Sequence, residues 1–194
     1  MSPWLVVGLG NPGPAYAGHR HNVGYLVVDE LARRTGSRLT VARGLRAETA
    51  EARLGLPGIE VPRLLLAKSR TFMNETGGAV SKLLRYYKLD LDQMIIVHDE
   101  IDLDPGQLRV KFGGGDNGHN GLRSIRASLD SGDFYRVRLG VGRPPGRQDP
   151  ADFLLSNFPA AARESVAVEV NRAADAVESL VTDGLERTQN IFNS

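Results

Sequence analysis

Two of the four histidines, His19 and His21, lie two positions apart in the stretch GHRHNVGY. Such a pair can hold a metal ion, supply a general base, or lie on a loop without a chemical role. With His98, Asp99 and His119 elsewhere in the chain, the residue types suit zinc or manganese. However, H-x-H on a loop is a weak motif, and H-E-x-x-H and C-x-x-C are both absent. We therefore expect no metal, with a metal-dependent hydrolase as a less favoured alternative.

A general base is the favoured interpretation of His21. A neutral imidazole, with a pKa of about 6.5, can take a proton from water at neutral pH. A carboxylate on the other ring nitrogen fixes the tautomer and stabilises the imidazolium, and Asp99, at the end of an apolar run, is the best-placed partner. The chain has no cysteine and no G-x-S-x-G motif, so the nucleophile would be water. Asparagines beside such a base can donate to a carbonyl oxygen without competing for protons.

The segment GLGNPG at Gly8–Gly13 matches the G-x-G-x-x-G pattern of dinucleotide-binding proteins, with acidic residues about twenty positions later. Pro12 and Pro14 interrupt the turn where the phosphate-binding helix would begin, and the acidic residues lie within a helical pattern. The glycines therefore favour a tight turn that allows a close approach to the backbone.

A second glycine-rich segment, FGGGDNGHNGL at Phe112–Leu122, precedes an apolar helical pattern. So much glycine is typical of a loop that must move or let a ligand approach the backbone. The alternative is a plain connection with Asn120 as the N-cap of the next helix.

Hydrophobic patterning predicts strands alternating with helices. Continuous apolar runs at Trp4–Leu9, Leu64–Ala67 and Met94–Val97 indicate buried strands. Alternating segments at Leu108–Phe112 and Arg136–Val141 predict two more, the second with Arg136 and Arg138 exposed on one face. Helical periodicity follows at Val23–Leu31, Val80–Tyr87 and, over the longest span, Val166–Leu180. We expect an α/β sandwich with a mostly parallel or mixed sheet.

Polar residues follow each of the three apolar runs: Asn11 the first, Asn74 the second and Asp99 the third. Ligands of open α/β sheets bind beyond the carboxyl ends of the strands. If the three strands are parallel neighbours, these side chains share one crevice, and His21 lies at the same edge.

Length, composition and charge limit the classes to which this protein can belong. With 194 residues, the chain is expected to form one domain spanning residues 1–194. It has no cysteine, no signal peptide at its start and no run of about 18 apolar residues, so we expect a soluble cytoplasmic protein. The net charge is only +1, but residues 105–150 hold eight basic and four acidic residues. This excess indicates either a solvated surface or a local patch for phosphates.

Five segments resemble, in order and spacing, those of the bacterial peptidyl-tRNA hydrolases: VVGLGNPGPAYAGHRHNVGY, KSRTFMNETG, VHDEIDLDPG, FGGGDNGHNGLRSI and FYRVRLGVGRP. The resemblance runs from Leu5 to about Phe158. It implies a monomeric, single-domain α/β/α sandwich with a twisted, mixed and mostly parallel central sheet. The implied reaction is hydrolysis of the ester between a peptide and the 3′-terminal ribose of tRNA, without metal or cofactor, which recycles tRNA from aborted translation.

Carried over by position, the resemblance implies three catalytic residues: His21 as the base that activates water, Asp99 as its carboxylate, and Asn11 as the asparagine that tells blocked from free aminoacyl-tRNA. The side chains that it places against the peptide or the 3′ end are Tyr16, Phe72, Met73, Asn74, His119 and Asn120. Those that it places on tRNA phosphate are Lys111 and Arg138, with assistance from Arg109.

The chain departs from the family pattern in two places. His19 stands where the family often has threonine, so no role is expected for it. Asp116 and Asn117 replace different residues of the glycine-rich loop, where an acid could weaken contact with RNA or face solvent. A non-catalytic RNA-binding module of the same fold is the alternative from another class.

Overall fold

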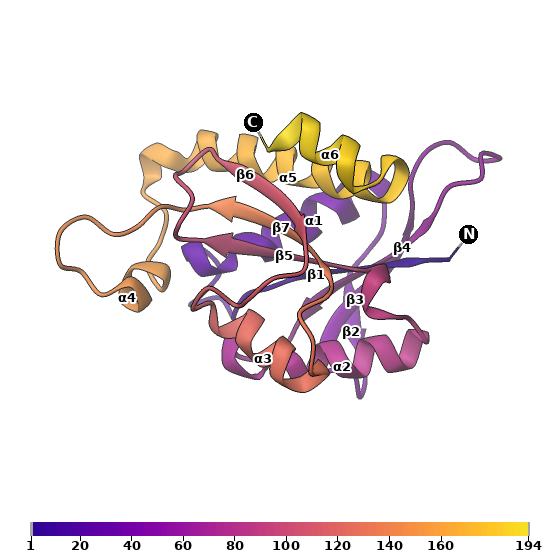
Figure 1. The fold of residues 1–194 in the computed structure, drawn as a ribbon, viewed down its shortest axis with the longest axis horizontal. Coiled ribbons are helices and arrows are strands. Elements are labelled where there is room, and N and C mark those ends of the chain that lie inside the picture. The colour runs from indigo at the N-terminus through magenta and orange to yellow at the C-terminus, as the bar shows by residue number, and fades with distance from the viewer. Residues whose placement is uncertain (1, 194) are drawn as a thin grey trace.

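The three apolar runs form the centre of one seven-stranded sheet in the computed structural model, which describes residues 2–193 (Figure 1). The strand order is β2-β3-β4-β1-β5-β7-β6. The strands are β1 (Trp4–Gly8), β2 (Thr40–Ala42), β3 (Ala47–Arg53), β4 (Arg63–Ser69), β5 (Met94–Glu100), β6 (Leu108–Phe112) and β7 (Tyr135–Gly140). Neighbours are parallel from β4 through β1 and β5 to β7, and antiparallel at both ends of the sheet.

Helices cover both faces of this sheet, which confirms the expected α/β/α sandwich (Figure 1). On one face lie α1 (Val23–Thr35), α5 (Arg163–Asp183) and α6 (Leu185–Phe192). On the other lie α2 (Thr76–Tyr87) and α3 (Asn120–Leu129), whereas the short α4 (Pro150–Leu154) belongs to a long excursion between β7 and α5. Single 3₁₀ turns occur at Arg20–Asn22, Met73–Glu75, Leu91–Gln93 and Ala160–Ala162.

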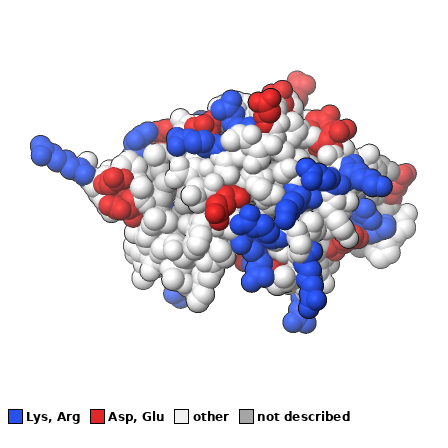
Figure 2. Space-filling view, turned by 90° about the horizontal axis from the view of Figure 1, so that it is seen from below, with Lys and Arg blue, Asp and Glu red and all other residues white. Residues whose placement is uncertain are grey.

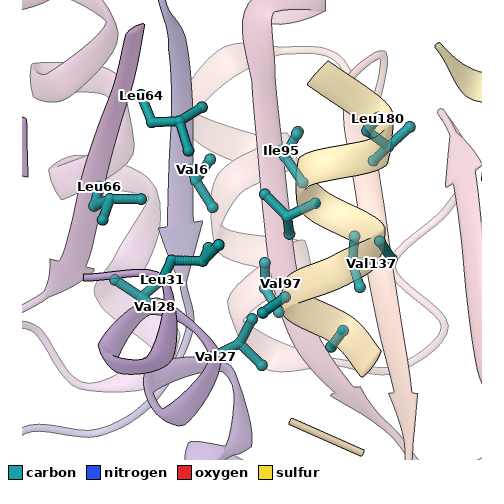
Figure 3. Close-up of a cluster of buried hydrophobic side chains, with 14 of the residues drawn as sticks. Val6, Val27, Val28, Leu31, Leu64, Leu66, Ile95, Val97, Val137 and Leu180 are labelled. Atoms are coloured by element: carbon teal, nitrogen blue, oxygen red, sulfur yellow. The ribbon is translucent and has the colours of Figure 1, made fainter. Parts of the chain in front are cut away.

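The central strands are apolar throughout because both of their faces are buried. In β1, Val6 packs toward α1 and α5, whereas Leu5 and Val7 pack toward α2 and α3. Figure 3 shows the first of these clusters, in which Leu31 of α1 and Leu180 of α5 converge on strand residues. One hydrophobic core on each face of the sheet therefore holds the central strands in place.

The Gly8–Gly13 segment serves backbone packing. A Cβ on Gly8 would lie 2.3 Å from the carbonyl oxygen of Gly24, and one on Gly24 would lie 2.4 Å from that of Val97. Helix α1 therefore rests directly on β1 and β5. The glycines predicted that something approaches the backbone closely, and the structure shows that this is helix α1 of the protein itself.

Sequence patterning missed β2 and β3. The sequence of β3, AETAEAR, is rich in alanine and glutamate, which favour helix. Its strand conformation comes from pairing with β4 over the full length from Ala47↔Ser69 to Arg53↔Arg63. Tertiary pairing overrides local preference here.

Two smaller expectations were wrong. Arg136 is not exposed beside Arg138 but is 1% exposed, and it donates to the carbonyls of Gly114 (2.6 Å), Gly115 and Gly132 (3.0 Å). Burial lowers the pKa of Arg136 to about 10, which leaves it charged at neutral pH. The N-cap of α3 is His119, and Asn120 is the first residue of the helix.

Helices α2 and α3 meet at Gly77, and this contact yields a paired test. A Cβ at Gly77 would lie 2.2 Å from the carbonyl oxygen of Ser124, whereas one at Gly78 meets only the flexible Arg46 side chain at 3.5 Å. We expect Gly77→Ala to lower the free energy of unfolding by about 2 kcal/mol through overpacking. Gly78→Ala should raise it by about 0.5–1 kcal/mol because alanine suits a helix better. Urea unfolding of both variants measures the difference, and equal stabilities would contradict this packing.

Candidate active site

The buried carboxylate of Asp99, near the end of β5, lies at the centre of the candidate site. Its oxygens lie 2.9 and 2.8 Å from Nδ1 of His21, and one of them lies 3.0 Å from Nε2 of His119. His21 comes from the 3₁₀ turn before α1, and His119 from the start of α3. Two helix starts on opposite faces of the sheet thus converge on one strand end.

The start of α3 determines which nitrogen of His119 carries the proton. Nδ1 of His119 accepts from the backbone N–H groups of Gly121 (3.1 Å) and Leu122 (3.3 Å), as an N-cap does. A neutral imidazole has one donor and one acceptor, so Nε2 of His119 donates to Asp99. His21 likewise donates from Nδ1, which leaves its Nε2 as the basic nitrogen.

The charges at this centre favour a proton on His21. Burial alone would lower the pKa of His21, but the charge of Asp99 and its hydrogen bond outweigh burial, so the net effect raises the pKa. Burial alone would raise the pKa of Asp99, but the two histidines hold it far below its usual range. Asp99 therefore stays ionised while His21 takes up and releases a proton.

His98 differs from these two histidines. It is fully buried, and burial and the neighbouring His119 place its pKa well below the usual range. Its Nδ1 donates to the backbone carbonyl of Asp99 at 2.8 Å, and its ring lies 5.0 Å from that of His119. His98 is thus a neutral packing partner beneath the site.

Asn11, in the loop after β1, is held by two other residues. Its Oδ1 accepts the backbone N–H of Met73 at 2.7 Å, which leaves Nδ2 as a free donor. Asn22, buried beside His21 in the sequence, accepts the Asn11 N–H and donates to the Asn11 carbonyl, both at 2.9 Å. One side chain therefore ties the Asn11 backbone to the turn that carries His21.

A cavity of about 470 Å³ lies above this centre. Its lining includes seven of the predicted site residues: Asn11, His21, Phe72, Met73, Asn74, His119 and Asn120. Tyr16 is adjacent, since its ring packs edge-on against Phe72 with centroids 6.0 Å apart. Asp99 lies beneath the cavity, bonded to the two histidines.

Several residues of the site were not identified from the sequence. Ile101, Leu154 and Leu155 give the cavity apolar walls, the latter two from the α4 excursion. No sequence motif marks these three residues. The only signal near Leu154 and Leu155 is Asp149, the N-cap of α4, which could have indicated a helix there. Asn22 is adjacent to His21, but its role depends on a contact eleven residues back in the chain.

The predicted tRNA-binding cations lie on β6 and β7, outside the cavity. Arg138 is partly buried and pairs with Glu100 at 2.9 Å. Arg109 donates to the backbone carbonyl of Asn193, which caps the edge strand β6. Burial and the nearby Arg138 lower the pKa of Lys111.

Basic side chains also gather on the face formed by α2 and α3, as Figure 2 shows. Helix α3 contributes Arg123 and Arg126 there, and α2 contributes Lys82 and Arg85. Asp116 of the glycine-rich loop lies 3.9 Å and 3.6 Å from the two arginines of α3. The acid of the loop is thus directed toward the protein's own cations.

His21, Asp99 and His119 offer ligand atoms within 4.8 Å of one another and could hold a metal ion. The Asp99 carboxylate, Nδ1 of His21 and both ring nitrogens of His119 are engaged in the hydrogen bonds above, so a metal on Nε2 of His119 would have to displace its proton while Nδ1 remains committed to α3. His19 is not in this group. It forms a backbone bridge with Asn157, and its ring packs 5.4 Å from that of Tyr16.

Known proteins match this chain in sequence and in fold. Residues 5–194 match the family described as Peptidyl-tRNA hydrolase. The chain is 59% identical over 200 residues to a peptidyl-tRNA hydrolase of Cutibacterium acnes, with 100% of both chains covered. It is 53% identical over 193 residues to one of Streptomyces coelicolor, covering 100% of this chain and 96% of that one.

A crystal structure of peptidyl-tRNA hydrolase from Acinetobacter baumannii superposes with a TM-score of 0.87 at 32% identity, covering 99% of this chain and 95% of that one. The chain therefore belongs to the peptidyl-tRNA hydrolase family. The resemblance found in the sequence is confirmed. Within residues 2–193, no helix is both long and apolar enough to cross a bilayer.

We call the two hydrogen bonds between the Asn22 side chain and the Asn11 backbone the Asn22 clamp, and they yield a test of stability. Asn22→Leu keeps the size of the side chain but leaves the N–H and carbonyl of Asn11 without partners in a buried place. Each such group costs about 1–3 kcal/mol, so we expect a loss of about 3 kcal/mol in the free energy of unfolding. The matched control is Asn190→Leu at an exposed position of α6, where the change should stay within about 0.5 kcal/mol. Comparable losses in both variants would show that the clamp contributes nothing special.

Proposed function

We propose that this chain hydrolyses the ester between a peptide and the 3′-terminal ribose of tRNA, with His21 as the base. The observation that carries the proposal is the pair of imidazole donors on the buried Asp99 carboxylate, beside the free amide of Asn11. Membership of the family supports the reaction and the substrate. The geometry supports the roles of the residues.

In the proposed reaction, Nε2 of His21 takes a proton from water as the water oxygen attacks the ester carbonyl carbon. Asp99 stabilises the imidazolium that forms. Nδ2 of Asn11 donates to the carbonyl oxygen, where negative charge develops. The bond from carbon to the ribose oxygen then breaks, the imidazolium returns its proton to that oxygen, and the products are a peptide acid and tRNA.

The peptide would be held by features that every peptide shares. Asn74 and Asn120 lie at the mouth of the cavity and can both donate to and accept from backbone amides. Phe72, Met73 and Tyr16 offer apolar surface beside them. Such a site accepts many sequences, as a substrate with variable peptides requires.

The RNA would bind on the side of β6 and β7. We propose that Lys111 contacts tRNA phosphate directly, and that Arg138 does so while it remains paired with Glu100. Arg109 would assist, because its guanidinium keeps its positive charge while it donates to the backbone carbonyl of Asn193. We further propose that residues 1–194 act as one catalytic domain and as a monomer, because all proposed roles are filled within one chain. We also propose that the protein acts in the cytoplasm, where its proposed tRNA substrate takes part in translation.

The pH dependence of the reaction tests the base. Only neutral His21 accepts a proton, so kcat/KM should fall as the pH drops through its pKa. Because Asp99 raises that pKa, the half-point should lie above pH 6.5. In Asp99→Asn the charge is absent while burial remains, so the half-point should move to lower pH and the plateau rate should fall. Hydrolysis of N-acetylaminoacyl-tRNA from pH 5 to 9 gives both profiles, and an unmoved half-point would rule out the pairing.

Removal of the base gives the matched comparison. We expect His21→Ala to lower kcat by about 10²–10⁴-fold, whereas His19→Ala should stay close to the unmutated protein. Persistent turnover in His21→Ala would overturn the mechanism. Loss of activity on exhaustive chelation would instead favour the metal-dependent hydrolase, and tRNA binding without cleavage would favour the RNA-binding module.

The salt dependence of RNA binding tests the phosphate contact. Each phosphate contact contributes about 0.7–0.9 to the slope of log K against log salt concentration. We expect Lys111→Ala to reduce the slope by roughly this amount and to raise KM with little change in kcat. Lys88→Ala, an exposed cation at the end of α2, is the control that should leave the slope unchanged. Equal slopes for all three proteins would remove Lys111 from the interface.

A further inference from the structure

A second cavity, of about 360 Å³, lies along the same edge of the sheet as the candidate active site. It is lined by Lys68, Ser69 and Arg70, where β4 ends, by Glu48 of β3, and by loop residues 12–14. We call this cavity the β4 groove.

The β4 groove adjoins the active-site cavity through shared elements. Asn11 lines both cavities. The chain that leaves β4 contributes residues 68–70 to the groove and then residues 72–74 to the active-site cavity. A ligand that passes Asn11 therefore moves along one continuous pair of loops.

The strand order gives this path a direction. From one end of the sheet inward lie the cations of β6 and β7, then Asp99 at the end of β5, then Asn11 after β1, and then the groove beyond β4 and β3. The scissile ester joins RNA on one side to peptide on the other. If the RNA lies over β6 and β7 and the ester at His21, the β4 groove lies on the far side of the ester from the RNA.

The lining of the groove suits a peptide of any sequence. Lys68 and Asp29 pair at 2.7 Å, so positive and negative groups lie side by side. Pro12, Pro14 and Val41 add apolar surface. The hydroxyl of Ser69, a residue of the lining, is buried and has no hydrogen-bond partner among residues 2–193.

We propose that the β4 groove binds the residues of the peptide that precede the esterified one. This inference rests on the proposed function and extends its substrate site. It assigns the groove to the peptide of peptidyl-tRNA rather than to RNA, since the cations of β6 and β7 lie on the opposite side of the ester.

A ladder of substrates tests the inference. One tRNA carries the same esterified residue, extended as the N-acetyl derivative, or as a di-, tri- or pentapeptide. In the unmutated protein, kcat/KM should rise by about tenfold, equivalent to ~1.4 kcal/mol, and then level off once the groove is filled. A flat ladder, with the acetyl substrate cleaved, overturns this inference alone. Failure to cleave any substrate overturns the proposed function.

Variants that fill the groove sharpen the test. Val41→Trp adds bulk from an exposed position, 53% accessible on the edge strand β2, and Ala17→Trp adds bulk from a second, exposed residue of the lining. Both should flatten the ladder and leave cleavage of the acetyl substrate unchanged. Val168→Trp, at an equally exposed position of α5 outside the groove, should keep the full ladder. Equal losses at every peptide length, or a ladder that survives both groove variants, would overturn the inference.

Discussion

A buried carboxylate must find hydrogen-bond donors, and at Asp99 this constraint organises the whole site. Both of its donors are imidazoles, one from each face of the sheet. An arginine partner would have neutralised the charge permanently. Imidazole donors satisfy the oxygens yet leave the negative charge in place, so the charge remains available to stabilise a proton on His21. The α1 and α3 helix starts, β1 and β5 are all needed to bring these groups together.

The sheet topology places the functional surfaces in sequence. Four parallel strands end at one edge, where the loops after β1 and β4 carry Asn11 and the 70–74 segment, and where Asp99 lies near the end of β5 itself. Antiparallel strands extend the sheet beyond this block on both sides, β6 with its cations and β3 with the wall of the β4 groove. Under the proposed function, a substrate with a nucleic-acid end and a peptide end would meet these surfaces in the same order.

The sequence predicted the parts of this structure that rest on strong local signals. Long apolar runs located the central strands, and the polar residues after them located Asn11, Asn74 and Asp99. Strand β3 was missed because its alanines and glutamates favour helix and only its pairing with β4 makes it extended. Arg136 was misplaced because alternation predicts which face a side chain occupies, but not that loop carbonyls will cover it. Asn22 could not be identified, since its role depends on a contact with a distant backbone.

The Asn22 clamp has a consequence for how the protein can fail. Asn11, proposed to donate to the carbonyl oxygen of the substrate, and His21, proposed as the base that activates water, are joined through the single buried amide of Asn22. A distortion that displaces Asn11 therefore also pulls on the turn that holds His21. In a cell full of aminoacyl-tRNA ready for use, a hydrolase that stayed fast after losing discrimination would drain the supply for translation. If Asn11 provides the discrimination that the family resemblance implies, its coupling to the turn of His21 would make damage slow the enzyme before the enzyme became indiscriminate.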